Sequence, residues 1–416
     1  MKIGIAVLGA GRWGVNLIRN FLEHPNSEVL AIVDQNPDSL AAVKKQFNLN
    51  ENVILASDWA QVQELPGLEA VAIATPASTH YTLTAAALNS GYHVLVEKPL
   101  ALNSGEALEL CQLAEKQQRQ LFVDHTYLFH PGVDRGQAII QQHQLGNLRY
   151  GYAQRTHLEP VRHDVDALWD LAVHDIAIFN TWLAQTPIQV RAMGSVFQKA
   201  TPPSPPPRGE FRRQSPPRQE VRRQSLPRQE VRRQPPPNPP LGGQSGPELP
   251  LGGKEEEKSS VSPTIFPQNS LEGLADLVWV TLTYPDGFQA FIHLCWLNPD
   301  KQRRLTVVGS LGTLIFDEMS PETPLILHRG NSDAGGEENS LGRVRAGEQT
   351  ILKNREILTL EPVEPLRQVC DRFLHCVQTN TPCPTSSGSQ SVQLIRILSA
   401  LSQSLELDGQ PLTISP

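Results

Sequence analysis

The chain has few cysteines, and none are spaced as a zinc site or a disulfide framework would require. The five cysteines lie at positions 111, 295, 370, 376 and 383, an odd number with no C-x-x-C pair. Scattered thiols of this kind are typical of a reducing compartment, and no Cys/His cluster indicates a metal site. We therefore expect a cytoplasmic protein that needs no metal.

Long apolar runs and an excess of basic charge are also missing. No run approaches the roughly 18 apolar residues that a membrane span needs, and the first 20 residues lack the pattern of a signal peptide. Outside residues 201–269 the chain has 25 lysines and arginines against 36 acidic residues. Because a nucleic-acid surface is basic, we expect neither nucleic acid nor a membrane as a partner.

Proline is concentrated in one segment. Residues 201–269 hold 17 of the 35 prolines, and residues 207–236 repeat a ten-residue unit, PRGEFRRQSP, PRQEVRRQSL and PRQEVRRQPP. This period is too short for a solenoid, and the segment offers few apolar residues to a core. We expect a disordered insertion. The alternative is a tether that binds an anionic partner or a proline-recognition module.

The N-terminus carries a G-x-G-x-x-G motif. Six apolar or small residues, 3–8, precede Gly9, Gly11 and Gly14, as a strand before a dinucleotide-binding turn would. Asp34 follows Gly14 by 20 residues, where such folds place an acid that binds a ribose hydroxyl and disfavours the 2′-phosphate of NADP. We expect NAD, with NADP the weaker candidate. A glycine-rich turn alone is common, and Asp34 could simply be a turn residue.

Strand and helix patterns alternate up to residue 125, which predicts a doubly wound parallel sheet with its ligand at the carboxyl ends of the strands. The polar residues expected at that edge are Thr75, His80, Glu97, Lys98 and His125. Lys98 directly follows a buried strand and could polarise a substrate oxygen beside the nicotinamide. It could equally be a solvated loop lysine, and His80 could be a capping or packing residue.

Asp170 and His174 are four residues apart on a helix predicted over 166–183, so they are expected to share one face. A carboxylate beside a histidine suits a general base near neutral pH, although a solvated pair is the plain alternative. Arg155, His157, Arg162 and His163 lie between a strand and this helix and could bind a phosphorylated or nucleotide-linked substrate. They could also form a solvated loop.

These residues resemble the Gfo/Idh/MocA family of oxidoreductases. The likeness rests on A-G-R-W-G at 10–14, A-T-P-x-x-x-H at 74–80, E-K-P at 97–99 and D-x-x-x-H at 170–174, and it covers almost everything except 201–269. It implies catalytic roles for Lys98, Asp170 and His174. The cofactor-binding residues are then Gly9, Gly11, Arg12, Trp13, Gly14, Asp34, Thr75, Pro76, His80 and Glu97, with His125, Arg155 and His157 as substrate candidates.

We therefore expect an NAD-binding Rossmann domain over 1–125. A C-terminal α+β domain with a large, mostly antiparallel open sheet should span 126–200 and 270–416, with a loop near 330–348. The expected reaction interconverts a secondary alcohol and a ketone of a sugar or nucleotide sugar, in a homodimer or homotetramer. The alternatives are an NAD-sensing protein without catalysis and a reductase of a non-sugar substrate such as a linear tetrapyrrole.

Overall fold

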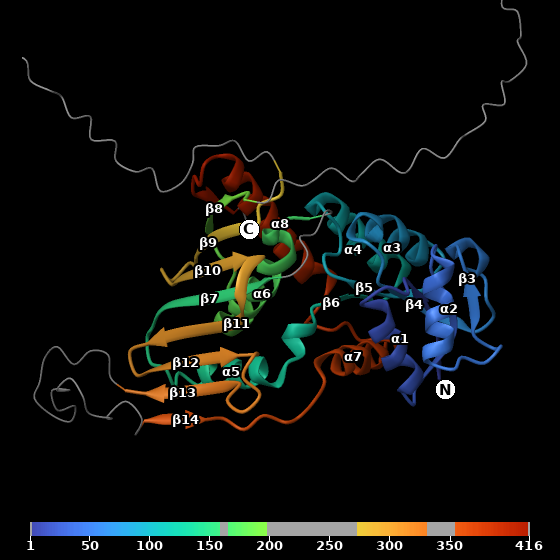
Figure 1. Ribbon diagram of the computed structural model, residues 1–416, viewed down its shortest axis with the longest axis horizontal. Helices are drawn as coiled ribbons and strands as arrows, with labels where there is room; N and C mark the ends of the chain where they lie inside the picture. Colours follow the sequence, from blue (N-terminus) through green and yellow to red (C-terminus); the bar gives the residue numbers. More distant parts are fainter. Residues whose placement is uncertain (1, 159–164, 198–272, 331–353, 415–416) are drawn as a thin grey trace, which may run out of the picture. The chain divides into compact units, whose positions relative to one another are not determined.

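The computed structural model describes residues 2–158, 165–197, 273–330 and 354–414, which contain two β-sheets (Figure 1). The predicted insertion at 201–269, the residues Arg162 and His163, and all but Gly330 of the predicted loop at 330–348 lie outside the described residues. Among the described residues, no helix is both long and apolar enough to cross a membrane.

The first sheet is parallel, with the strand order β3-β2-β1-β4-β5-β6. This is the order of a Rossmann fold, and it confirms the predicted α/β class. Its strands are β1 (Ile3–Leu8), β2 (Ser27–Val33), β3 (Ile54–Ala56), β4 (Leu68–Ile73), β5 (His93–Glu97) and β6 (Leu121–Asp124), and its helices are α1 (Gly14–Glu23), α2 (Pro37–Gln46), α3 (His80–Asn89) and α4 (Ser104–Gln117).

The parallel sheet is buried on both faces, as the continuous apolar runs of its strands require. All six residues of β1 are buried, and alternate residues of the strands contribute to two separate cores. The C-terminal part of the chain completes both cores. Phe373 from α7 (Pro365–Thr379) belongs to one, and Ile395 from α8 (Gly388–Glu406) belongs to the other.

The second sheet has nine strands in the order β14-β13-β12-β11-β7-β10-β9-β8-β15, and its pairs are antiparallel except β7 with β10. This confirms the predicted mostly antiparallel sheet. The strands are β7 (Leu148–Leu158), β8 (Gln189–Ser195), β9 (Leu277–Thr283), β10 (Gln289–Cys295), β11 (Leu297–Gly309), β12 (Gly312–Asp317), β13 (Leu325–Arg329), β14 (Arg355–Ile357) and β15 (Leu412–Thr413).

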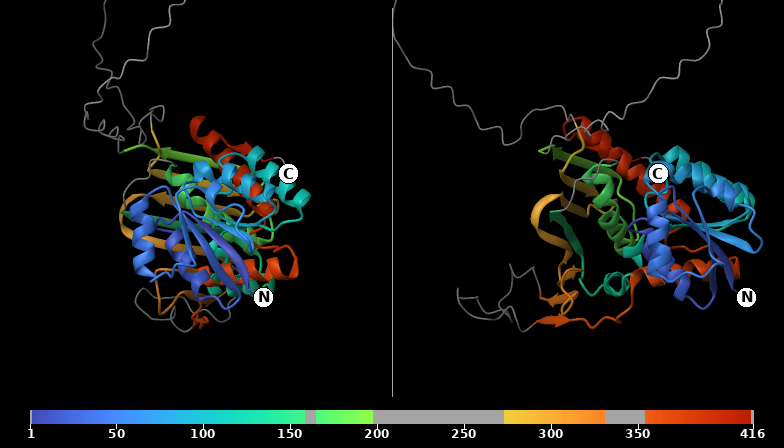
Figure 2. Two further views of the ribbon diagram at one scale, coloured as in Figure 1. Left: turned by 90° about the vertical axis from the view of Figure 1, so that its right-hand side faces the viewer. Right: turned by 45° about the vertical axis from the view of Figure 1, so that its right-hand side comes forward.

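In the part of the chain that the structure describes, helices cover one face of this sheet and leave the other open (Figure 2). Apolar residues of α5 (Pro131–Gln141), α6 (Val173–Leu183) and α8 form a single core with the inward residues of the strands (Figure 2). The other face carries large side chains that remain exposed, among them Tyr150, Tyr152, Trp279 and Phe291. The sheet therefore has one core face and one aromatic face.

Two local features differ from the sequence-based expectation. Helix α5 is not among the elements expected from the sequence. Gly136 is needed there, since a Cβ at this position would lie 2.3 Å from the Trp182 ring. The helix predicted over 166–183 is present and ends at Leu183, but its first part, Leu168–Ala172, is a π-helix, and α6 begins at Val173.

Candidate active site

The glycine turn after β1 has the backbone that its sequence predicts. Gly9 adopts a positive φ of 97°, and a Cβ on Gly14 would lie 1.9 Å from the Gly9 carbonyl oxygen, so the first turn of α1 packs directly on the loop. A Cβ on Gly11 would meet nothing within 4 Å, which leaves this backbone open to a ligand. These are the separate tasks of the three glycines in a dinucleotide-binding turn.

Asp34 closes this turn from the end of β2. Its Oδ2 accepts a hydrogen bond of 2.7 Å from the backbone N–H of Ala10, and its Oδ1 accepts one of 2.8 Å from the N–H of Asn36. The carboxylate is thus held against the glycine turn at the strand edge, which is where an acid can bind a ribose hydroxyl. The residues present therefore fit a dinucleotide cofactor.

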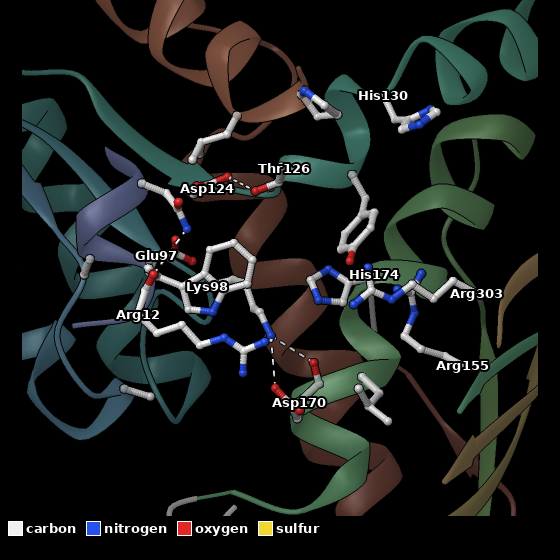
Figure 3. Close-up of a pocket in the computed structure, with 18 of the residues that line it drawn as sticks. Arg12, Glu97, Lys98, Asp124, Thr126, His130, Arg155, Asp170, His174 and Arg303 are labelled. Carbon is white, nitrogen blue, oxygen red and sulfur yellow. Dashed lines mark hydrogen bonds and ion pairs between the residues drawn. The ribbon is translucent and has the colours of Figure 1, made fainter. Parts of the chain in front are cut away.

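A cavity of about 540 Å³ lies between the carboxyl edge of the parallel sheet and the second sheet, and most of the predicted site residues line it (Figure 3). The structure brings together Arg12, Trp13, Thr75, His80, Glu97, Lys98, Arg155, His157, Asp170 and His174. Gly9, Gly11, Gly14, Asp34, Pro76 and His125 do not line this cavity. Most of the cofactor-loop residues thus lie apart from the residues proposed for chemistry.

Lys98 is held by the π-helix. Its Nζ donates a hydrogen bond of 2.9 Å to the backbone carbonyl of Asp170 and lies 3.4 Å from the Asp170 carboxylate (Figure 3). The Asp170 carbonyl belongs to the π-helix Leu168–Ala172, and π-helical segments are frequent at functional sites. Both side chains are mostly buried, at 14% and 17% exposed. The ammonium is therefore fixed where it faces the cavity.

His174 lies at the start of α6, one turn from Asp170. Its ring packs edge-on against Tyr127 with 4.4 Å between the ring centroids. Burial and the charges of Lys98 and Arg155 hold the pKa of His174 well below its usual value. A neutral imidazole at neutral pH can accept a proton. The Asp170 carboxylate lies 3.4 Å from Lys98 Nζ, and the segment that carries it is π-helical where a regular α-helix was predicted.

The substrate candidates from the sequence have different surroundings. His157 lines the cavity. Arg155 also reaches it, but its guanidinium makes a buried bidentate pair with Asp175, with bonds of 3.0 and 2.9 Å. His125 is turned away from the cavity, and its Nε2 lies 3.0 Å from Ser391 Oγ on α8. The structure therefore gives no support to substrate contact by His125, because α8 fills the space beside it.

His80 joins the two loops that frame Lys98. Its Nδ1 lies 2.7 Å from the carbonyl oxygen of Pro99, and its Nε2 lies 2.9 Å from that of Thr75. The ring is 1% exposed. It therefore acts in the structure as a brace between the ends of β4 and β5, which is close to the packing alternative for this residue.

Sequence reasoning missed several residues of the cavity: Asp124, Tyr127, His130, Trp296, Arg303 and Glu318. The ring of Tyr127 lies under two guanidinium groups, 4.6 Å from that of Arg155 and 5.9 Å from that of Arg303. Glu318 lies 2.8 Å from Arg303. Asp124 was detectable, since it ends a predicted strand of the parallel sheet. The residues from β11 and beyond carry no local signal.

The comparisons with known proteins agree with this geometry. Residues 3–125 match the profile of the family described as "Oxidoreductase family, NAD-binding Rossmann fold". This part of the chain therefore resembles the Gfo/Idh/MocA oxidoreductases, as the motifs of the sequence indicated. The predicted Rossmann fold and the predicted NAD cofactor are thereby confirmed.

Two curated relatives of the family match part of the chain. UDP-N-acetylglucosamine 3-dehydrogenase from Acidithiobacillus ferrooxidans is 29% identical over 169 residues, which are 40% of this chain and 51% of that protein. Levoglucosan dehydrogenase from Pseudarthrobacter phenanthrenivorans is 25% identical over 195 residues, covering 40% of this chain and 49% of that protein. The chain thus matches about half the length of these relatives.

The likeness of folds extends further than the likeness of sequences. A solved structure of the Acidithiobacillus ferrooxidans UDP-N-acetylglucosamine 3-dehydrogenase superposes with a TM-score of 0.67, covering 98% of this chain and 99% of that one at 17% identity. At this identity the match concerns the fold alone, including the second sheet. Both sheets of this chain therefore occur together in another protein.

Proposed function

We propose that this protein is an NAD-dependent oxidoreductase that interconverts a secondary alcohol and a ketone on a sugar or nucleotide sugar. The observation that carries the proposal is the position of Lys98 and His174 in one cavity beside the glycine turn, the first as a fixed cation and the second as a neutral base. The named substrates of the two relatives support the choice of substrate class.

The chain's own residues divide the work. His174 accepts the proton of the substrate hydroxyl, because its ring is neutral at neutral pH. Lys98 donates a hydrogen bond to the oxygen as negative charge develops on it, and Asp170 holds the ammonium in place through its carbonyl and carboxylate. Gly9, Gly11, Gly14 and Asp34 hold the cofactor, which supplies a nicotinamide as hydride acceptor when bound.

Further cofactor contacts are proposed for the residues that line the cavity beside the turn. Arg12, Trp13, Thr75 and Glu97 are in position for this, whereas Pro76 and His80 shape the loop that presents Thr75. His157 and Arg303 remain candidates for binding the substrate. We propose a cytoplasmic location and the domain division expected from the sequence. In that division α7 packs into one core of the parallel sheet, and α8 contributes both to its other core and to the core of the second sheet.

The test is a panel of sugars and nucleotide sugars incubated with the full chain and NAD, with NADH formation followed by absorbance. A turned-over substrate should lose at least about 10²-fold in kcat with Lys98→Ala or His174→Ala. NADH affinity should change little in either variant, and Lys116→Ala, on the exposed side of α4, should behave as wild type. A rate that is insensitive to Lys98→Ala would overturn the mechanism. Binding of NADH without turnover of any sugar would favour the sensor or the non-sugar reductase.

We also propose that the protein is a homo-oligomer that uses the aromatic face of the nine-stranded sheet. Exposed apolar patches of this kind mark interaction sites, and the rings here form two stacked pairs, Trp279 with His293 and Tyr150 with Tyr152. Light scattering should give a dimer or tetramer, and Trp279→Glu combined with Phe291→Glu should shift it toward the monomer. An unchanged mass in that double variant would contradict this use of the face.

A further inference from the structure

Glu97 and Asp124 face each other at the carboxyl edge of the parallel sheet. They are the last residues of β5 and β6, and they are direct neighbours in the register of these strands. In a parallel pair, neighbours in register place their side chains on the same face. Both residues line the cavity next to Lys98, and Asp124 is 1% exposed. Two carboxyl groups therefore share one buried position.

Their oxygens lack the donors that two carboxylates would need. Asp124 Oδ1 accepts a hydrogen bond of 2.6 Å from Thr126 Oγ1. The buried atoms Glu97 Oε1 and Asp124 Oδ2 have no donor among the described residues. Because the two residues are register neighbours on adjacent strands, their side chains lie side by side, and a hydrogen-bonding contact between them would satisfy these atoms. Because ionised carboxylates only accept hydrogen bonds, this contact forms only if one of the groups carries a proton.

The electrostatics of the pair point the same way. Burial and the neighbouring Asp124 charge raise the pKa of Glu97 well above its usual value, and burial raises the pKa of Asp124 to about 6. The charge of Lys98 opposes both shifts. The buried Cys370 thiol on α7 is a further titratable neighbour, and burial followed by the Asp124 charge raises its pKa. The same cavity is also lined by cationic side chains, those of Arg12, Arg155 and Arg303.

We propose that Glu97 and Asp124 form a carboxylic acid–carboxylate pair that keeps one shared proton at neutral pH and so places a single negative charge beside Lys98. The pair is a positioning element. A pair with one negative charge balances the positive charge of the Lys98 ammonium, which can still donate a hydrogen bond to the substrate oxygen. Release of the shared proton at alkaline pH puts a second negative charge in the same buried space, which drives the two carboxylates apart and repels an anionic dinucleotide.

The shared proton is independent of the proposed function, whereas the effect on the cofactor rests on it. Infrared spectroscopy of the protein without cofactor tests the first part, since a protonated carboxyl has a C=O stretch that a carboxylate lacks. At neutral pH the difference between wild type and Asp124→Asn should contain this band, shifted in D₂O, and so should the difference for Glu97→Gln. The matched control is Glu69→Gln, which removes an exposed carboxylate of β4 and should give no such band. Absence of the band in both differences would overturn the shared proton.

The second part is tested by titrating each protein with NADH across the pH range and following fluorescence. Wild type should lose NADH affinity, by about tenfold or more, over the pH range in which the infrared band disappears. Asp124→Asn should show no such step, because its amide donates permanently to Glu97. A wild-type affinity without this step, or a step that survives in Asp124→Asn, would overturn the positioning role. Failure of every protein to bind NADH would overturn it together with the proposed cofactor, while the infrared result would still decide the shared proton.

Discussion

Arg155 of β7 and Asp175 of α6 form a bidentate ion pair in the core beneath the candidate site, with bonds of 3.0 and 2.9 Å and side chains only 4% and 2% exposed. Burial alone would lower the pKa of Arg155, but the adjoining Asp175 carboxylate outweighs it and raises that pKa. The pair ties the central strand of the second sheet to the helix that carries His174. Because its guanidinium is bound to Asp175, Arg155 lines the cavity but is held in place at its wall.

Removing one partner of this ion pair should lower the free energy of unfolding far more than replacing both partners with apolar residues. Asp175→Ala leaves a buried guanidinium without its partner, which typically costs about 3–5 kcal/mol of stability. The double variant Arg155→Met, Asp175→Leu removes both charges and should unfold much closer to wild type. Urea unfolding of the three proteins measures the difference. A loss below about 1 kcal/mol in Asp175→Ala would contradict a buried, coupled pair.

Gly14 and Gly11 should separate folding from cofactor binding. Gly14→Ala places a Cβ 1.9 Å from the Gly9 carbonyl oxygen, so the loop or the helix must shift and both stability and NADH affinity should fall. Gly11→Ala meets nothing within 4 Å, so its stability should stay within about 0.5 kcal/mol of wild type. Its NADH affinity should nevertheless drop, since the new methyl group occupies the path of the pyrophosphate. Thermal unfolding and fluorescence titration measure the two effects, and tight NADH binding by Gly11→Ala would contradict the site.

Asp34 should determine which dinucleotide is preferred. Its carboxylate, anchored by the N–H groups of Ala10 and Asn36, is in position to repel a 2′-phosphate. Asp34→Asn should therefore weaken NADH binding and strengthen NADPH binding. The ratio of NADH affinity to NADPH affinity should fall by about tenfold. Asp58, which caps the turn after β3 through the N–H of Ala60, provides the control. Asp58→Asn should leave the ratio unchanged, and an equal change in both variants would refute the assignment.

His125 should make the protein less stable in mild acid. Burial, together with the charge of Lys98, lowers its pKa to about 3 in the folded protein. In the unfolded chain the same ring takes up a proton near pH 6.5, so between these values only the unfolded state is protonated. Its contribution to stability is complete above the unfolded pKa and is lost as the pH falls from 6.5 toward 3. Between about pH 7.5 and about pH 5, wild type should lose about 2 kcal/mol more than His125→Gln.

Denaturant unfolding at the two pH values provides the comparison. His375→Gln, which replaces an exposed histidine of α7, is the matched control and should lose stability in parallel with wild type. Equal slopes for wild type and His125→Gln would show that this ring takes up its proton in the folded state. It would then not be buried in neutral form against Ser391.

The sequence by itself determined the Rossmann half of this protein. The glycine turn, the distance from Gly14 to Asp34 and the place of Lys98 after a buried strand are all local. Parallel strands bring their carboxyl ends to one edge whatever the rest of the chain does. The second sheet was also predictable in kind, because turns and alternating residues identify antiparallel strands.

Only the tertiary structure decided how the two halves meet. No local pattern shows that the segment before α6 is π-helical and offers the Asp170 carbonyl to Lys98. The pairing of Arg155 with Asp175 joins a strand to a helix across 20 residues, and His125 faces Ser391 across 266. Partners this far apart are chosen by packing, which fixes where a side chain can point. The sequence therefore identified the charged and polar groups, and the fold decided which of them contact one another.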